Sequence, residues 1–310
     1  MKRLTCLAAA LALVCMAASA QPAAPDKKIE TVIVTAPKLS DEVKAEIHNF
    51  VFTLAAPAPV TGEVARWDSH GPLCPQTYGF TKSSDNEFVT FRIRQIAAEV
   101  GAPVKPAPCF PTVEVYFASN PQQLLDAIRE HGGSTWLTSR PSHAKEVAVF
   151  AHPIQAWYST VTRDDCGSLS FDNEDNGWDG TVPAPGCPPP GHGMYAVVGS
   201  RVHTGLQSLL GHVYIVVDVN KTAHTSFQAV ADYIALLALS RTQDFESCQP
   251  LPSIANLMSD NCDAAWKPGA MTATDLAYLT GIYSMDPGAS FLTQRSTIIS
   301  KVQGAMTGGQ

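Results

Sequence analysis

The chain has 310 residues, of which 21 are lysine or arginine and 28 are aspartate or glutamate, so its formal net charge is −7. Without the first twenty residues, 290 remain, with 19 basic and 28 acidic side chains. An acidic excess of this size argues against nucleic acid or an anionic membrane surface as a partner.

Residues 1–20 have the layout of a secretory signal peptide. Lys2 and Arg3 precede an apolar run, and a small-residue cleavage site ends at Ala20. The run is too short to span a bilayer once its flanks are excluded, and neither of its two cysteines lies in a lipoprotein pattern. We therefore expect a soluble mature protein that is periplasmic or secreted.

Residues 21–39 are predicted to form a disordered tail that contains one β-prone segment. This segment consists of Ile29, Glu30, Thr31, Val32, Ile33, Val34, Thr35 and Ala36. It resembles a TonB box, the short peptide by which outer-membrane receptors of Gram-negative bacteria recruit the energising protein TonB. The resemblance implies a TonB-like partner, to whose sheet edge the peptide would add a strand. The alternatives are a first strand that pairs with the chain's own sheet, and a tail without a partner.

A single globular domain is predicted from residue 40 to residue 310, and its first part alternates between helix and strand. Ser40 is expected to cap a helix whose apolar stripe ends at Leu54. After a proline-containing break, residues 63–67 are a candidate for a short strand.

Residues 84–132 continue this alternation. Ser84 and Glu87 have the spacing of a capping box, and Gly101 is a fitting end for the helix that follows. Residues 112–118 alternate like a strand. The next helix is expected to have its cap, its first position and its end at Asn120, Pro121 and Gly132.

Six cysteines follow the signal peptide, an even number that indicates disulfides in an exported protein. They are Cys74, Cys109, Cys166, Cys187, Cys248 and Cys262. Six cysteines permit 15 pairings, among which we favour the sequential set because each of its bonds would close one local excursion. The last pair closes a loop of roughly fifteen residues, a crosslink worth about 3 kcal/mol. A zinc site is disfavoured because the cysteines lack metal-binding spacing.

Four strands are expected in the middle of the chain, at residues 146–150, 154–161, 195–202 and 213–219. Residues 162–192 between them are rich in Asp, Gly and Pro and are interpreted as an irregular insertion. The last two strands are expected to be neighbours in one sheet.

Residues 227–239 are apolar on nearly every side, so they are predicted to form a buried central helix. The order of strand, polar turn and central helix resembles the zincin metallopeptidases, whose active-site helix carries the motif H-E-x-x-H. The positions that match the two histidines and the glutamate are Ala231, Ala235 and Asp232. The fold prediction is therefore α+β, a single mixed domain with a central sheet packed on a buried helix in a zincin-like layout.

The chain after the central helix adds to this resemblance. Zincins often carry a Ser-Ile-Met-like turn beneath the metal, and here residues 253–256 read Ser-Ile-Ala-Asn. Thr272 and Asp275 have the spacing of a capping box, and the helix that they begin resembles one that closes many zincin domains. Residues 291–302 are expected to form a last helix.

Asp232 alone keeps the type of residue that the zincin motif needs. Zinc catalysis requires two imidazoles one helical turn apart and an acid that takes a proton from water. With Ala231 and Ala235 at the ligand positions, we expect Asp232 to be a buried acid satisfied by an arginine or a backbone donor. No catalytic residue, metal or cofactor is predicted.

Other metal sites have weaker support. The run at residues 172–177 opens like a calcium loop, but Pro183 replaces the bidentate glutamate. His143 and Glu146 form part of an inverted zinc motif that Val147 interrupts. His192, His203, His212 and His224 have no spacing that forces two of them onto one face.

These observations predict an exported, disulfide-stabilised and non-catalytic pseudo-metallopeptidase that binds a ligand or is associated with the cell envelope. Its overall pattern resembles uncharacterised secreted proteins of Gram-negative bacteria. The alternatives are a hydrolase whose active site assembles only in three dimensions, a TonB-interacting accessory protein, and an unrelated α+β fold.

Overall fold

The computed structural model describes residues 38–131, 148–172, 203–242 and 247–308. The chain divides into two compact units, Met1–Thr35 and Ala36–Gln310, and all described residues belong to the second. In them, five strands form one mixed sheet and are accompanied by seven α-helices, which confirms the predicted α+β class. The predicted signal peptide and the segment 29–36 lie outside the described residues and stay predictions.

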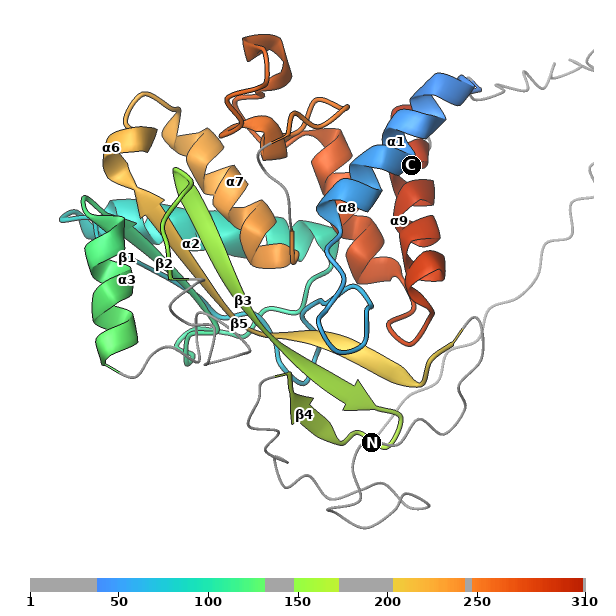
Figure 1. Ribbon diagram of the computed structural model, residues 1–310, viewed down its shortest axis with the longest axis horizontal. Helices are drawn as coiled ribbons and strands as arrows, with labels where there is room; N and C mark the ends of the chain where they lie inside the picture. The colour runs from blue at the N-terminus through green and yellow to red at the C-terminus, as the bar shows by residue number, and fades with distance from the viewer. Residues whose placement is uncertain (1–37, 132–147, 173–202, 243–246, 309–310) are drawn as a thin grey trace, which may run out of the picture. The chain divides into compact units, whose positions relative to one another are not determined.

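The sheet has the strand order β1-β2-β5-β3-β4 (Figure 1). The strands β1 (Pro75–Tyr78), β2 (Val113–Ala118) and β5 (Leu206–Asp218) are parallel to one another. The strand β3 (Ile154–Asp164) pairs antiparallel with β5, and β4 (Leu169–Phe171) pairs antiparallel with β3.

The strand β5 begins at Leu206, seven residues earlier than predicted, because Gly211 interrupts the strand pattern in the sequence. The register between β3 and β5 shifts at Ser159 and Thr160, which face His212 and Leu210, so Gly211 is the extra residue of a β-bulge. A Cβ atom at Gly211 would lie only 3.0 Å from Cγ2 of Val161. Gly211 therefore allows β3 and β5 to lie close together at the bulge.

One face of the sheet packs on two helices, α2 (Ser83–Val100) and α7 (Phe227–Leu239). The alternating residues of β2 and β5 on this face belong to the main core: Val113, Val115, Phe117, Val213, Ile215 and Val217. Eleven of the thirteen residues of α7 are buried. The predicted central helix is confirmed, with both of its ends at the predicted residues. It is buried because a helix without a polar side is stable only in the interior.

The other face of the sheet is covered by α3 (Pro121–Glu130) (Figure 1). Leu125 of α3 packs there with Trp157, Tyr214 and Val216, which form a smaller second core. The helix begins as predicted, because the Asn120 side chain accepts a hydrogen bond from the Gln123 amide.

Three helices extend the main core beyond the sheet: α1 (Asp41–Leu54), α8 (Ala273–Ser284) and α9 (Phe291–Met306). Helices α8 and α9 approach closely at Gly281, where a Cβ atom would lie 2.8 Å from Cα of Ile298. The predicted caps at Ser40 and Thr272 are both confirmed, and Thr272 forms the full capping box with Asp275.

Four local predictions were wrong. Residues 63–67 form no strand, only isolated bridges such as Pro57 with Val64. Ser84 and Glu87 form no capping box, since α2 already begins at Ser83 and both lie inside its first turns. Residues 148–150 contain no strand. The predicted insertion at 162–192 is regular at its start, where β3 continues and β4 pairs with it.

Two of the three predicted disulfides are confirmed, Cys74–Cys109 and Cys248–Cys262. Cys166 is also disulfide-bonded. Its predicted partner Cys187 lies outside the described residues, as do Gly132 and the strand predicted at 195–202. In the described ranges, no helix combines the length and the apolar character needed to cross a bilayer.

Candidate functional site

The position that the zincin resemblance assigns to the active site lies inside the protein. Ala231 and Ala235 on α7 are 0% exposed and belong to the main core. Asp232 is also 0% exposed, although it carries a carboxylate. A charged group at such a depth needs partners, because burying an unpaired charge is very costly.

Both carboxylate oxygens of Asp232 are engaged. Arg92 of α2 binds them as a fork, with Nε 2.5 Å from Oδ1 and the second nitrogen 3.1 Å from Oδ2. The Gln228 side chain donates to Oδ1 at 2.8 Å, and the Met271 amide donates to Oδ2 at 2.7 Å. The expectation of a buried acid satisfied by an arginine and a backbone donor is therefore confirmed.

This ion pair links three separated parts of the chain. The hydrogen bond to Asp232 raises the pKa of Arg92 above its usual range, so the guanidinium stays charged. Arg92 comes from α2, Asp232 from α7, and Met271 immediately precedes the cap of α8. The carboxylate consequently fixes the mutual placement of these elements and has no oxygen to offer to water or a metal.

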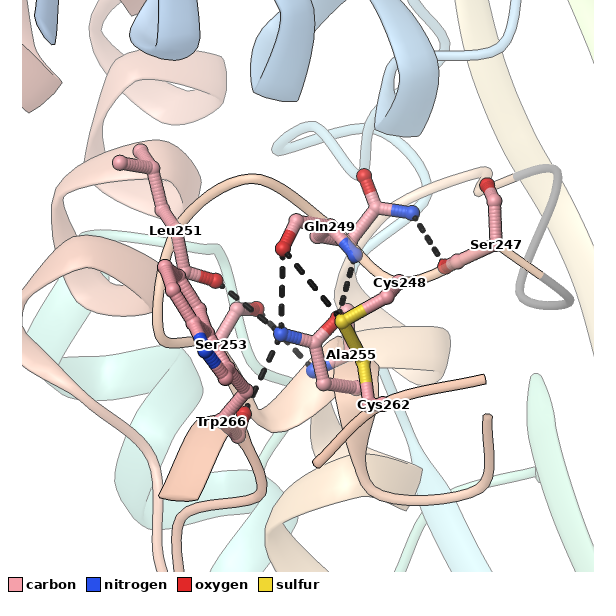
Figure 2. The surroundings of a disulfide bond; sticks show 9 residues. Ser247, Cys248, Gln249, Leu251, Ser253, Ala255, Cys262 and Trp266 are labelled. Atoms are coloured by element: carbon pink, nitrogen blue, oxygen red, sulfur yellow. Dashed lines mark hydrogen bonds between the residues drawn. A yellow bond between two sulfur atoms is a disulfide. The ribbon is translucent and has the colours of Figure 1, made fainter. Parts of the chain in front are cut away.

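The turn at residues 253–256 is held by α8 and by a local network. Ser253 Oγ donates to Asp275 Oδ1 at 2.5 Å, and the Ile254 amide donates to Oδ2 at 2.9 Å. The Asn256 side chain accepts from the Gln249 amide at 2.7 Å and donates to the carbonyl oxygens of Leu251 and Trp266. Figure 2 shows the part of this network around Gln249, Leu251 and Trp266, beside the Cys248–Cys262 disulfide.

A second polar cluster, which the sequence did not reveal, lies on the α3 face of the sheet. Glu114 of β2 accepts hydrogen bonds from the hydroxyls of Tyr116 at 2.5 Å and Tyr214 at 2.8 Å. Nε2 of His212 lies 3.2 Å from the same carboxylate. Burial alone would raise the pKa of Glu114. The hydrogen bonds from His212, Tyr116 and Tyr214 stabilise the ionised carboxylate more strongly, so the pKa of Glu114 is lowered.

Aromatic rings line this cluster. The rings of Tyr78 and Tyr116 stack with centroids 5.0 Å apart, and those of Tyr116 and Tyr214 with centroids 5.9 Å apart. Burial and the neighbouring Glu114 raise the pKa of both Tyr116 and Tyr214, so their hydroxyls act as proton-bearing donors. This arrangement stabilises an ionised carboxylate and holds no activated nucleophile.

A third polar site surrounds Glu63, which is 1% exposed. One carboxylate oxygen accepts a hydrogen bond from Thr204 Oγ1, and within the described part of the chain the other has no hydrogen-bond partner. Burial raises the pKa of Glu63 to about 7, against the opposing effects of Thr204 and of the His203 charge, while Asp286 adds to the rise. Glu63 is thus a buried acid that titrates near neutrality.

Substitution of Glu63 by glutamine is expected to remove a pH dependence of stability. An unfolded glutamate ionises near 4.5, whereas the folded one keeps its proton to about 7, so the native protein loses stability as pH rises between these values. E63Q should therefore exceed the wild type by about 1–3 kcal/mol above neutral pH and match it at acid pH. Urea unfolding across this pH range measures the difference, and the exposed Glu46→Gln is the control. Parallel pH profiles for E63Q and the wild type would contradict the assignment.

The remaining predicted site residues are not brought together. His203 forms an isolated bridge with Ala289, His212 lies on β5, and His224 follows α6 (Val219–Thr222). His192, His143 and Glu146 lie outside the described ranges. Asp172, the first residue of the calcium-like run, is buried and accepts hydrogen bonds from Thr160 and Thr162. Among described residues, no group of three His, Cys, Asp or Glu side chains is placed to hold a metal ion.

Comparisons of the chain with protein families, with curated proteins and with solved structures found no match.

Proposed function

We propose that this chain is an exported, non-catalytic binding protein built on a zincin-like scaffold, a pseudo-metallopeptidase. The observation that carries the proposal is the buried fork between Arg92 and Asp232. Asp232 is the residue that the zincin resemblance matches to the catalytic acid, and the fork uses both oxygens of its carboxylate for structure.

The order of elements supports the zincin-like layout. Strand β5 is followed by the short helix α6 (Val219–Thr222), by α7, by the turn η2 (Ile254–Asn256) and by α8. The turn packs against α7, as the resemblance expects of the turn beneath the metal. Ala255 stands where that turn would carry its methionine. The layout is thus compatible with a metallopeptidase ancestor whose chemistry is lost.

The chemistry of the residues supports the loss of hydrolysis. A methyl group has no lone pair, so Ala231 and Ala235 cannot coordinate zinc. Asp232 cannot take a proton from a metal-bound water while Arg92, Gln228 and Met271 occupy its oxygens. The two described disulfides are the kind of crosslink that persists in an oxidising compartment, which supports export.

Metal analysis tests this proposal. The chain, purified in a zinc-containing buffer without chelators and then dialysed, is expected to hold far less than one zinc per molecule by mass spectrometry. The same preparation should not cleave casein above the level of a matched D232N variant. One tightly held zinc per molecule, or cleavage that D232N abolishes, would overturn the proposal.

The β-prone segment 29–36 favours a second candidate, an accessory protein that contacts TonB. We expect a peptide of residues 28–38 to shift amide resonances in the labelled C-terminal domain of TonB, because an extended peptide can add a strand to a sheet edge. A peptide with Val32→Pro is the matched control, since proline removes a strand donor. Unchanged spectra with the native peptide would end this interpretation.

A further inference from the structure

The disulfide Cys74–Cys109 joins a buried residue to a more accessible one. Cys74 immediately precedes β1 and is 2% exposed, whereas Cys109 lies in the connection between α2 and β2 and is only half-buried. The residue after Cys109, Phe110, is 82% exposed, so this connection lies at the surface. An attacking thiolate can therefore reach the bond from the Cys109 side, and exposed disulfides are the ones that exchange readily.

A guanidinium lies against the Cys109 sulfur. Nη2 of Arg94, on α2, donates a hydrogen bond to Cys109 Sγ at 3.3 Å, and Nη1 donates to the carbonyl oxygen of Lys105 at 2.7 Å. Arg94 is half-buried, yet no carboxylate of the described residues lies within ion-pair distance of it. Glu87 lines the same groove on α2, but it lies two helical turns away, roughly 10 Å along the axis. Burial lowers the pKa of Arg94, as expected of a cation without a counter-charge.

Reduction would give Arg94 the anion that it lacks. A disulfide sulfur is a weak, neutral acceptor, whereas a Cys109 thiolate would form a charge-assisted hydrogen bond with the guanidinium. A neighbouring arginine lowers the pKa of a thiol in this way, and stabilising the reduced form makes a disulfide easier to reduce. The bond Cys248–Cys262 has no such neighbour: among the described residues no lysine or arginine donates to either of its sulfurs, and the side chains labelled around it in Figure 2 are uncharged.

Hydrogen bonds hold the two ends of this loop together in addition to the disulfide. The Cys74 amide donates to Thr112 Oγ1 at 2.9 Å, and the Cys74 carbonyl oxygen accepts from the Thr112 amide, just before β2. The Leu73 amide donates to the carbonyl oxygen of Pro103, and its own carbonyl oxygen accepts from the Lys105 amide. Breaking the S–S bond therefore leaves the two sulfurs close together, so that the bond can form again.

We propose that Cys74–Cys109 is a redox-active disulfide that exchanges with a dithiol. First, a thiolate of the dithiol attacks Sγ of Cys109 to form a mixed disulfide, and the S–S bond breaks with its electron pair on Cys74, which takes up a proton. Next, the second thiolate of the dithiol attacks its partner sulfur in the mixed disulfide, and Cys109 leaves as a thiolate paired with Arg94. The protein bond gains two electrons, the dithiol loses two and becomes a disulfide, and its second proton goes to solvent. The inference goes beyond the proposed function and does not depend on the interpretation of α7.

Redox equilibration tests this inference. The chain from residue 21 to residue 310 is equilibrated at pH 9 with reduced and oxidised dithiothreitol in varied ratio, then quenched with acid, alkylated and mapped by mass spectrometry. The mapping gives the reduced fraction of each bond separately. We expect Cys74–Cys109 to be half-reduced at a less reducing ratio than Cys248–Cys262, because only the first has a cation beside its sulfur.

Arg94→Met should lower the equilibrium constant for reduction of Cys74–Cys109 about fivefold or more at pH 9, since one pKa unit of thiolate stabilisation is about a factor of ten once the thiol is ionised. At pH 6, where the thiol is protonated in both proteins, R94M and the wild type should match. R94K should lie closer to the wild type, because it keeps the positive charge, and Arg129→Met on α3 is the matched control. A folding defect in R94M would make both disulfides easier to reduce, which is the opposite direction.

Cys74→Ser leaves Cys109 as a free thiol and gives a second measurement. The pH dependence of its alkylation by iodoacetamide should show a pKa below about 8.5, the usual value for cysteine, and C74S/R94M should raise that pKa by about one unit. Earlier reduction of Cys248–Cys262 in the wild type, an unchanged equilibrium in R94M at pH 9, or a Cys109 pKa at or above the usual value would each overturn the proposal. None of these measurements involves zinc or proteolysis, so a failure here is distinguishable from a failure of the proposed function.

Discussion

Replacing Arg92 with alanine is expected to destabilise the protein by about 3–5 kcal/mol, because it leaves a buried carboxylate without its counter-charge. Asp232 is 0% exposed, and Arg92 contributes two of the hydrogen bonds that satisfy it. Domains are typically stable by only about 5–15 kcal/mol. This single truncation should therefore remove a large part of the total stability.

Urea unfolding of matched variants measures this effect. Arg129 forms an exposed ion pair with Asp126, and Arg129→Ala should cost less than about 1 kcal/mol. The double variant R92M/D232L, which replaces both charges by apolar groups, should lie closer to the wild type than R92A does. An R92A variant as stable as R129A would show that the fork contributes nothing and would weaken the structural role of Asp232.

The sequence was sufficient where one physical signal dominated. Helix α7 was predicted from residue 227 to residue 239 because no arrangement other than burial accommodates a segment without a polar side. The cap at Thr272 was predicted because Asp275 is correctly placed to return its hydrogen bond. Ser84 and Glu87 have the same spacing and failed, because the helix starts one residue before Ser84. Spacing alone does not fix where a helix begins.

The sequence was insufficient where a polar cluster joins residues that are far apart in the chain. Arg92 and Asp232 are 140 residues apart, so only the fold identifies which arginine satisfies the acid. The Glu114 cluster draws its members from β2 and β5, and the alternation in β2 showed only that Glu114 and Tyr116 share a face. Glu63 lies in a segment predicted as a strand, and nothing local indicates that it would be buried or accept a hydrogen bond from Thr204.

The same limit applies to the zincin resemblance. A pattern of elements predicts a layout, but it cannot show whether space for a metal remains. Ala231 and Ala235 could have faced an open cleft with their ligands missing, or a core packed up to their methyl groups. Their exposure of 0% supports the second state, so the position that the resemblance assigns to the metal lies in the interior.

Placing histidines at positions 231 and 235 is therefore expected to unfold the protein rather than create a zinc site. Each imidazole must enter a packed core, which costs about 1–3 kcal/mol for overpacking and about 1–3 kcal/mol for a buried polar group without a partner. The A231H/A235H variant should thus lose about 4 kcal/mol or more. Urea unfolding with and without zinc measures this loss, and Ala98→His at an exposed position of α2 is the control.

Stabilisation of the A231H/A235H variant by zinc would contradict this prediction. A ligand that binds only the native state stabilises it in proportion to the logarithm of its concentration. If zinc raised the stability of A231H/A235H but not that of A98H, the two side chains would have found room to converge on one ion. The region around α7 would then have space for a metal ion, which would contradict the packed core described above. We expect no such stabilisation, because the fork from Arg92 and the core around α7 hold the elements together where a cleft would need them apart.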